Sequence, residues 1–271
     1  MFVMYGDEAD AEQGRGQKVF VYGGVFIPVA CIQRLHDTIE GMRAKYGFRE
    51  GDSLKFASRT CPAHVTRDDH TKIKNDVMIV AEDCGAKFCA YAALHDIVKS
   101  QKDQYIQWGC NTILGRFNEF CGLNKTYGIA QLDRMSAGNA WDYICEKFSK
   151  GNEFGGKWMR LERITALGFT CDGASHLASV CDIILGSFRY CVNEEDKDIA
   201  GNAMFPQIVD LMWKKEKDNK EYVRDIGLTL APKVVKVPKY QEEYDALSNR
   251  LQTYLDEKRS AHSTKSANAA K

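Results

Sequence analysis

The chain has no apolar run that approaches the roughly 18–20 residues needed for a membrane-spanning helix. Its first residues, MFVMYGDEAD, contain neither the basic stretch nor the small-residue cleavage pattern of a secretory signal. With 44% hydrophobic and 27% charged residues, the composition is typical of a globular protein with a buried core. The sequence therefore predicts a cytoplasmic protein that has no membrane partner.

An excess of charge of either sign is also missing, because 37 Lys and Arg residues balance 37 Asp and Glu residues. This neutrality removes the simplest electrostatic argument for nucleic-acid binding. It leaves open a local basic surface that faces an acidic site.

Cysteine is plentiful, but the spacings that bind zinc are absent. None of the ten cysteines forms a C-x-x-C pair or a Cys/His cluster. Several lie within apolar periodic segments, where a free cysteine behaves as a small hydrophobic residue. We therefore expect reduced thiols.

The common hydrolase motifs are missing as well. Residues 7–10 spell DEAD, the letters of a helicase motif, but no phosphate-binding loop precedes them. The nearest match, GNEFGGKW at 151–158, follows a predicted helix and has Trp158 where Ser or Thr must ligate Mg²⁺. The chain also contains no G-x-S-x-G, H-E-x-x-H or EF-hand pattern. A nucleotide-driven motor is therefore excluded.

What is present is an alternation of β-rich and helix-periodic segments, without internal repeats or linkers. The paired glycines 23–24 within the second strand indicate a bulge or a close approach of another backbone. We expect an α/β domain over 1–200, a helical extension packed on it over 201–258, and a disordered tail over 259–271. The expected strands are 2–6, 18–27, 86–94, 126–132 and 162–170, and the expected helices are 30–47, 72–85, 104–122, 139–150, 175–193 and 205–215, with another after Pro238.

The most informative residue is Asp182, which lies in the apolar helix SHLASVCDIILGSFRY. Helical spacing places Asp182 on a narrow polar stripe with Ser175, Ser179, Gly186 and Arg189. A buried carboxylate is costly unless it is paired or bound to a cation. Two explanations stay open, a salt bridge to Arg189 or Arg134 and a divalent-metal site.

Two further carboxylates, Asp7 and Asp133, come at the ends of predicted strands. Carboxylates from different elements can hold Mg²⁺ or Mn²⁺ for phosphoryl displacement. The candidate site residues also have ordinary interpretations. Asp133 could cap the next helix, Glu8 could be a solvated loop charge, and His176 could be a polar group at a helix N-terminus.

Four segments in this order resemble the DUF 3800 family, whose members come mostly from bacteria, phages and mobile elements. They are YGDEAD (5–10), LKF (54–56), QLDRMS (131–136) and SHLASVCDIILGSFRY (175–190). The resemblance implies an RNase H-like fold, with a mixed five-stranded sheet flanked by helices and the first strand central, beside the fourth. It implies Asp7, Asp133 and Asp182 as ligands of Mg²⁺ or Mn²⁺ and Lys55 as a further catalytic residue. It also implies Arg134 as a cationic partner, and we expect Glu8, Ser175, His176 and Ser179 as further supporting residues, with Ser179 near a position where the family more usually has Gln.

The predicted function is that of a metal-dependent nuclease or phosphodiesterase that acts on RNA or DNA, in phage or mobile-element conflict. The alternative is a non-catalytic binding or structural protein on a degenerate RNase H-like scaffold. The zero net charge favours this alternative, as does Asp-Glu-Ala-Asp where the family commonly has Asp-Glu-Ser-Gly. A small nucleotide as substrate also stays open. The segments after residue 200 could form a lid or the surface of a homo-oligomer.

Overall fold

The computed structural model describes residues 1–9, 17–98, 101–133, 140–154, 156–171 and 173–269. Its centre is a mixed six-stranded sheet with the strand order β10-β3-β2-β1-β4-β7. The strands are β1 (Phe2–Ala9), β2 (Val19–Pro28), β3 (Lys87–Leu94), β4 (Gly128–Asp133), β7 (Ile164–Thr170) and β10 (Leu228–Leu230). Strands β1, β2 and β3 pair antiparallel, whereas β1–β4, β4–β7 and β3–β10 are parallel pairs.

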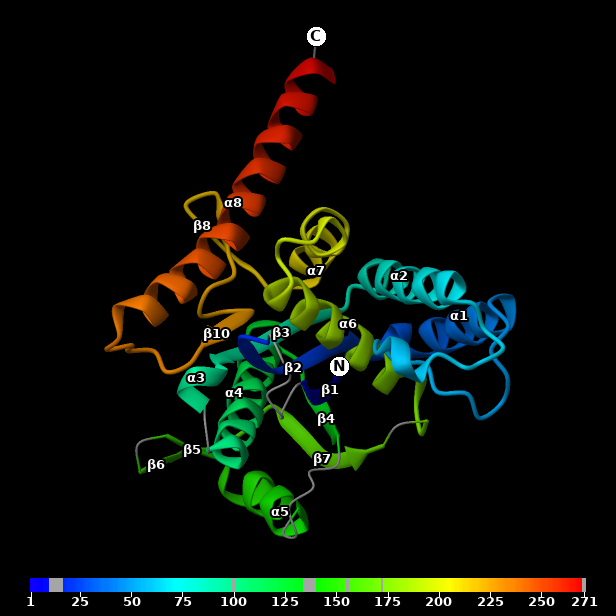
Figure 1. Cartoon of the computed structure of the whole chain (residues 1–271). Helices are drawn as coiled ribbons and strands as arrows, with labels where there is room; N and C mark the ends of the chain where they lie inside the picture. Colours follow the sequence, from blue (N-terminus) through cyan, green and yellow to red (C-terminus); the bar gives the residue numbers. More distant parts are fainter. Residues whose placement is uncertain (10–16, 99–100, 134–139, 155, 172, 270–271) are drawn as a thin grey trace.

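Helices cover both faces of this sheet (Figure 1). They are α1 (Ile32–Lys45), α2 (Arg67–Asp83), α3 (His95–Val98), α4 (Lys102–Leu123), α5 (Ala140–Lys150), α6 (His176–Asn193), α7 (Phe205–Leu211) and α8 (Pro238–Ala269). The smaller elements are the hairpins β5 (Asn152–Phe154)–β6 (Lys157–Met159) and β8 (Lys215–Lys217)–β9 (Lys220–Tyr222), with the short helical segments η1 (Val29–Cys31), η2 (Ser58–Thr60) and η3 (Ile199–Met204). In the described part of the chain, no helix combines the length and the apolar character needed to cross a membrane.

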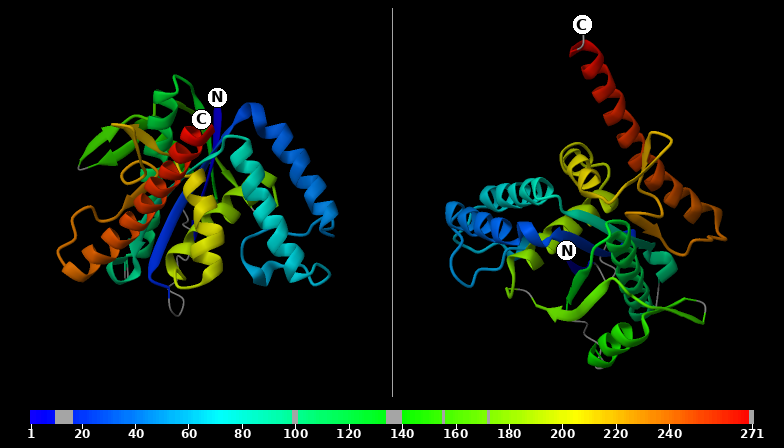
Figure 2. Two further views of the ribbon diagram at one scale, coloured as in Figure 1. Left: turned by 90° about the horizontal axis from the view of Figure 1, so that it is seen from above. Right: turned by 180° about the vertical axis from the view of Figure 1, so that it is seen from behind.

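The layers follow from the side-chain pattern of β2, which is buried along nearly its whole length. Val21 and Val25 point into a core with α1, α2 and α6, and Tyr22 and Phe26 point into a second core beneath α4. Helix α6 packs across β1 and β2, and α1 and α2 pack on α6 (Figure 2). Because β2 has a core on each face, it is apolar at almost every position.

The paired glycines of β2 mark close approaches of helices rather than a bulge. The registers of β2 with β1 and with β3 run without a shift through Gly23 and Gly24. A Cβ atom on Gly23 would lie 2.6 Å from Cδ1 of Leu185 in α6. A Cβ atom on Gly24 would lie 2.5 Å from Cγ2 of Ile113 in α4. The missing side chains let both helices lie close to the sheet.

The arrangement of the five long strands confirms the predicted order and directions, but the predicted number of strands was wrong. The sixth strand, β10, pairs with β3 through three residues, LTL at 228–230, which are too few to show an alternating pattern. The segment after residue 200 was predicted to be helical, yet it contains β10 and the hairpin β8–β9 as well as α7 and α8. The division of the chain into a domain over 1–200 and an extension over 201–258 stays a prediction.

Helix α8 continues through Ala269, so residues 259–269 are helical where a disordered tail was predicted. The base of α8 is fixed by Tyr244, whose hydroxyl donates to the carbonyl of Ala231 at 2.6 Å and accepts from the N–H of Leu94 at 3.0 Å. The far end of α8 extends away from the sheet in Figure 1 and in the right-hand view of Figure 2.

Candidate active site

Asp7 and Asp133 lie where the parallel pairing of β1 and β4 ends; β1 was predicted to stop at residue 6, but it continues through Asp7 to Ala9 along β2. Gly6 of β1 is paired with Leu132 of β4, so the next residue on each strand is one of the two carboxylates. Both line a small cavity of about 10 Å³, together with Thr170 at the end of β7 and Cys181 of α6. The predicted approach of Asp7 to Asp133 is therefore confirmed.

Asp182 reaches the same place from helix α6. It lines a second cavity, of about 140 Å³, together with Asp7, Glu8 and Arg189. Asp7 thus lines both cavities, one with Asp133 and the other with Asp182. The predicted polar stripe of α6 is also present, since Asp182 and Arg189 are half-buried whereas Val180 and Ile183 are fully buried.

The three carboxylates act on one another electrostatically. Burial raises the pKa of Asp7 well above the usual 3.8, and the negative charges of Asp133, Glu8 and Asp182 raise it further. The N–H of Glu8 donates a hydrogen bond of 2.8 Å to Oδ1 of Asp7. This hydrogen bond lowers the pKa of Asp7, but its effect is smaller than those of burial and of the negative charges. The pKa of Asp7 therefore reports a buried site of concentrated negative charge.

Cys181 gives a second measure of the same concentration of charge. Its thiol donates to the carbonyl of Tyr5 at 3.2 Å, beside Asp7. Burial raises the pKa of this thiol, and Asp7, Asp182 and Asp133 all raise it further. All three carboxylates are therefore near enough to this buried thiol to act on it electrostatically.

This electrostatic arrangement predicts how stability depends on pH. The folded state raises the pKa of Asp7, so it binds that proton more tightly than the unfolded chain does. The contribution of Asp7 to stability is therefore fully present below the unfolded pKa of 3.8 and is lost as the pH rises through the higher folded pKa. We expect the unfolding free energy of the metal-free wild type, relative to that of Asp7→Asn, to fall over this range.

Urea unfolding in EDTA at a series of pH values measures this difference. The Asp7→Asn variant serves as the reference because all other titrating groups are common to both proteins. A constant difference in unfolding free energy across the series would show that the pKa of Asp7 is not raised.

A loop between α1 and α2 fixes the position of Asp182. The N–H of Phe56 donates to Oδ2 of Asp182 at 2.6 Å. Gly186, one turn further along α6, makes room for this loop, because a Cβ there would lie 2.4 Å from Cγ of Phe56. The hydrogen bond and the close packing hold the Asp182 carboxylate in one orientation.

The loop is also held by a cation from α2 that was not among the predicted site residues. Nζ of Lys74, in α2, donates to the carbonyl of Phe56 at 3.1 Å and lies 4.8 Å from the centre of its ring. Burial lowers the pKa of Lys74, and the charge of Asp182 acts in the opposite direction. Lys74 is thus a partly buried positive charge within the electrostatic reach of Asp182.

The three predicted cations, Lys55, Arg134 and Arg189, do not lie together in one described place. Lys55 lies half-buried in the loop next to Phe56, and its backbone interacts with His70. Arg134 lies outside the described residues. Arg189 lines the cavity that contains Asp7 and Asp182, as the helical stripe predicted.

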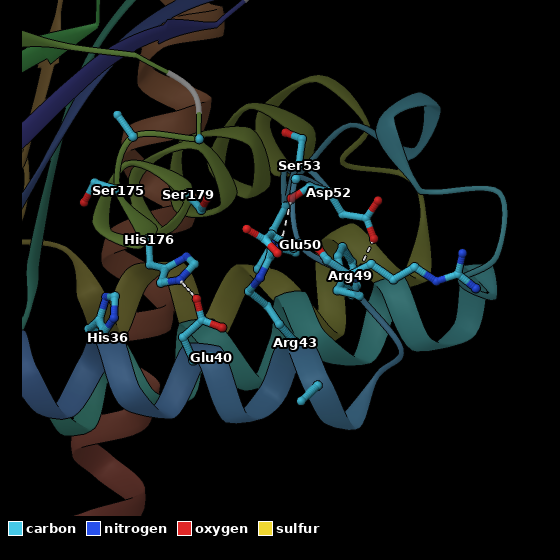
Figure 3. A pocket seen from close by; sticks show the side chains of 16 residues that line it. His36, Glu40, Arg43, Arg49, Glu50, Asp52, Ser53, Ser175, His176 and Ser179 are labelled. Carbon is cyan, nitrogen blue, oxygen red and sulfur yellow. Dashed lines mark hydrogen bonds and ion pairs between the residues drawn. The ribbon is translucent and has the colours of Figure 1, made fainter.

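The remaining predicted supporting residues divide between two places. Glu8 follows Asp7 on β1 and acts on its pKa. Ser175, His176 and Ser179 instead line a separate and much larger cavity of about 640 Å³ between α1, the N-terminus of α6 and the loop at 48–54 (Figure 3). Their link to the carboxylates is indirect, through a hydrogen bond of 3.3 Å between the hydroxyls of Ser175 and Tyr5.

No protein-family model matches the sequence, and no curated protein matches it significantly. Among solved structures, the chain is similar to a chain of the PCNA:RNase HII complex from Archaeoglobus fulgidus. The two share 10% sequence identity and a TM-score of 0.39, over 80% of this chain and 97% of that chain. Likeness at this level does not establish a common fold, so the function of this chain has to be inferred from its own strand order and side chains.

The carboxylates offer the type of donor atom that a hard divalent cation prefers, although among the described residues their oxygens are not all within 4.8 Å of one another. Mg²⁺ and Mn²⁺ prefer oxygen ligands, and Asp7, Asp133 and Asp182 supply them from three elements. The charges with the largest effect on Asp7 are all negative, so the site is unfavourable unless a proton or a cation neutralises it. A bound divalent ion would remove this repulsion.

Proposed function

We propose that this chain is a phosphodiesterase of the RNase H-like type that depends on Mg²⁺ or Mn²⁺ and cleaves RNA or DNA. The observation that carries the proposal is the position of Asp7, which is half-buried, lines one cavity with Asp133 and another with Asp182, and has a raised pKa. Membership of the DUF 3800 family is part of the proposal. It is supported by the strand order, with β1 central and parallel to β4.

The roles of the residues follow from their placement. Asp7, Asp133 and Asp182 would hold the metal, which when bound offsets the charge of the reacting phosphate and favours ionisation of the attacking water. The N–H of Phe56 keeps the Asp182 carboxylate oriented. Lys74 holds the Phe56 loop through its carbonyl and adds positive charge beside the site. Positioned charge of this kind stabilises a transition state at little cost in reorganisation.

Metal-dependent thermal stability tests the site. We expect Mg²⁺ or Mn²⁺ to raise the melting temperature of the wild type above its value in EDTA, because an ion that binds only the folded state stabilises it by mass action. At a free ion concentration of 100 times Kd, the gain is about 2.7 kcal/mol. Asp182→Asn should lose most of this gain. The control is Asp245→Asn, which removes an exposed carboxylate that pairs with Arg224.

An identical response of the wild type and Asp182→Asn to both ions would contradict the assignment of Asp182 as a ligand. If neither ion stabilises the wild type, the non-catalytic scaffold becomes the better interpretation. Capture of binding partners would then take priority over a search for substrates.

A further inference from the structure

A second group of metal-binding side chains lies on the wall of the 640 Å³ cavity. His36, Glu40 and His176 each place one ligand atom within 4.8 Å of the ligand atoms of the other two. Glu40 and His176 are joined by a hydrogen bond, and the rings of His36 and His176 lie 4.9 Å apart between centroids. Figure 3 shows His176 pointing from α6 towards the two α1 side chains.

The backbone holds these three residues in place before any ligand binds. His36 and Glu40 are separated by one turn of α1, so they lie on the same face of that helix. His176 is the first residue of α6, and the Ser175 hydroxyl caps this helix by accepting from the N–H of Leu177 at 3.1 Å. Since α1 packs against α6, the three ligand atoms converge through two rigid elements.

The donor set selects a particular class of ion. Two imidazoles and one carboxylate suit Zn²⁺ and neighbouring late transition metals, whereas Mg²⁺ prefers oxygen ligands alone. The Glu40 side chain is 55% exposed and that of His176 is 18% exposed, so the cluster is open to the cavity. Three protein ligands beside an open space leave a coordination position for a further ligand.

We propose that His36, Glu40 and His176 bind a divalent transition-metal ion of the Zn²⁺ class, with one coordination position open to the cavity. The bound ion would join α1 to the N-terminus of α6. This site is separate from the Asp7–Asp133–Asp182 site, uses different donor atoms, and does not depend on the proposed phosphodiesterase function.

The test uses the full chain without a histidine tag, after treatment with EDTA. Co²⁺ is titrated while its visible absorption is recorded, and Zn²⁺ is then added as a competitor. The main variant is His36→Gln, which removes one ligand but leaves the Glu40–His176 hydrogen bond in place. The control is His64→Gln, because His64 forms a comparable pair with Asp52, at 3.0 Å, outside the cluster.

We expect one Co²⁺ ion per chain, displaced by Zn²⁺ but not by Mg²⁺, with absorption bands that lack the near-ultraviolet thiolate contribution. The affinity should fall at least about tenfold in His36→Gln, since the loss of even an outer partner of a metal ligand has an effect of this size. His64→Gln should bind as the wild type does. The melting temperature in EDTA should be the same in His36→Gln and wild type.

Three results would overturn the proposal. They are equal affinity in His36→Gln and the wild type, a thiolate signal that places the ion on cysteines, and absence of Co²⁺ binding. Each would leave the Glu40–His176 pair as an ordinary link between helices. None of these results bears on the Mg²⁺ response of Asp182→Asn, so the two sites can fail independently.

Discussion

Asp7→Asn is expected to abolish metal-dependent phosphodiester cleavage and, at neutral pH, to raise the melting temperature of the metal-free protein. Asparagine removes a ligand charge from the centre of the site, and several kcal/mol of transition-state stabilisation depend on that ion. Each 1.4 kcal/mol corresponds to about a tenfold change in rate, so the loss should reach at least about a thousandfold. Stability should rise because burial of the ionised Asp7 carboxylate is unfavourable and because Asp133, Glu8 and Asp182 repel it.

The measurement combines two assays on the same preparations. Cleavage is followed with labelled single-stranded RNA, single-stranded DNA, duplexes and an RNA–DNA hybrid, each with Mn²⁺ or with EDTA. Thermal unfolding in EDTA gives the stability, and Asp245→Asn is again the matched control. Wild-type cleavage that persists in Asp7→Asn would contradict the catalytic role, and an unchanged or lowered melting temperature would contradict the electrostatic repulsion.

The convergence of the three carboxylates could be predicted from the sequence because each one follows an element with a clear pattern. Asp7 and Asp133 each follow an apolar run, and the parallel pairing of these two runs brings the residues that follow them together. Asp182 interrupts an apolar helix with a polar stripe, which the burial of α6 confirms. The strand order itself came from the family resemblance, since periodicity does not determine which strands are neighbours.

The residues that orient the site could not be predicted in the same way. Phe56 acts through its backbone N–H, which every residue except proline possesses, so no residue type marks this role. Lys74 lies in a helix with several other charges, and the sequence gives no sign that its side chain turns towards a loop. The predicted cation, Lys55, is next to Phe56 in the chain, but the hydrogen bond to Asp182 is donated by the backbone of Phe56.

The His36–Glu40–His176 group shows a different limit of sequence reasoning. The spacing of His36 and Glu40 is visible as i and i+4 on one helix, but this spacing is common on solvated helices. His176 lies 136 residues after Glu40, and only the packing of α1 on α6 brings them together. A long-range pair of this kind depends on tertiary structure.

Gly23 connects the packing of the sheet to the geometry of the carboxylates. It is paired with Asp7 across β1 and β2, and Leu185 of α6 occupies the space above it. Leu185 is three residues after Asp182, about one helical turn away. The small size of Gly23 therefore determines how close Asp182 comes to Asp7.

We expect Gly23→Val to destabilise the fold and to remove most of its response to Mg²⁺ or Mn²⁺. Its Cβ would lie 2.6 Å from Cδ1 of Leu185 and 2.9 Å from Cε2 of Phe88, so helix or strand must move. Overpacking of this kind costs about 1–3 kcal/mol or more. Valine favours strands, so backbone propensity would not explain a loss. Urea unfolding with and without the ion measures both effects.

Gly41→Ala is the matched control, because it also enlarges a glycine but in a different environment. Gly41 is exposed on α1, and a Cβ there would meet no atom within 4 Å. Alanine in a helix is more stable than glycine by about 0.5–1 kcal/mol, so this variant should gain stability and keep the metal response. If Gly23→Val kept both the wild-type stability and the wild-type metal response, α6 would not be held against β2 at this point. The distance between Asp182 and Asp7 would then have to be set elsewhere, with the Phe56 loop as the next element to test.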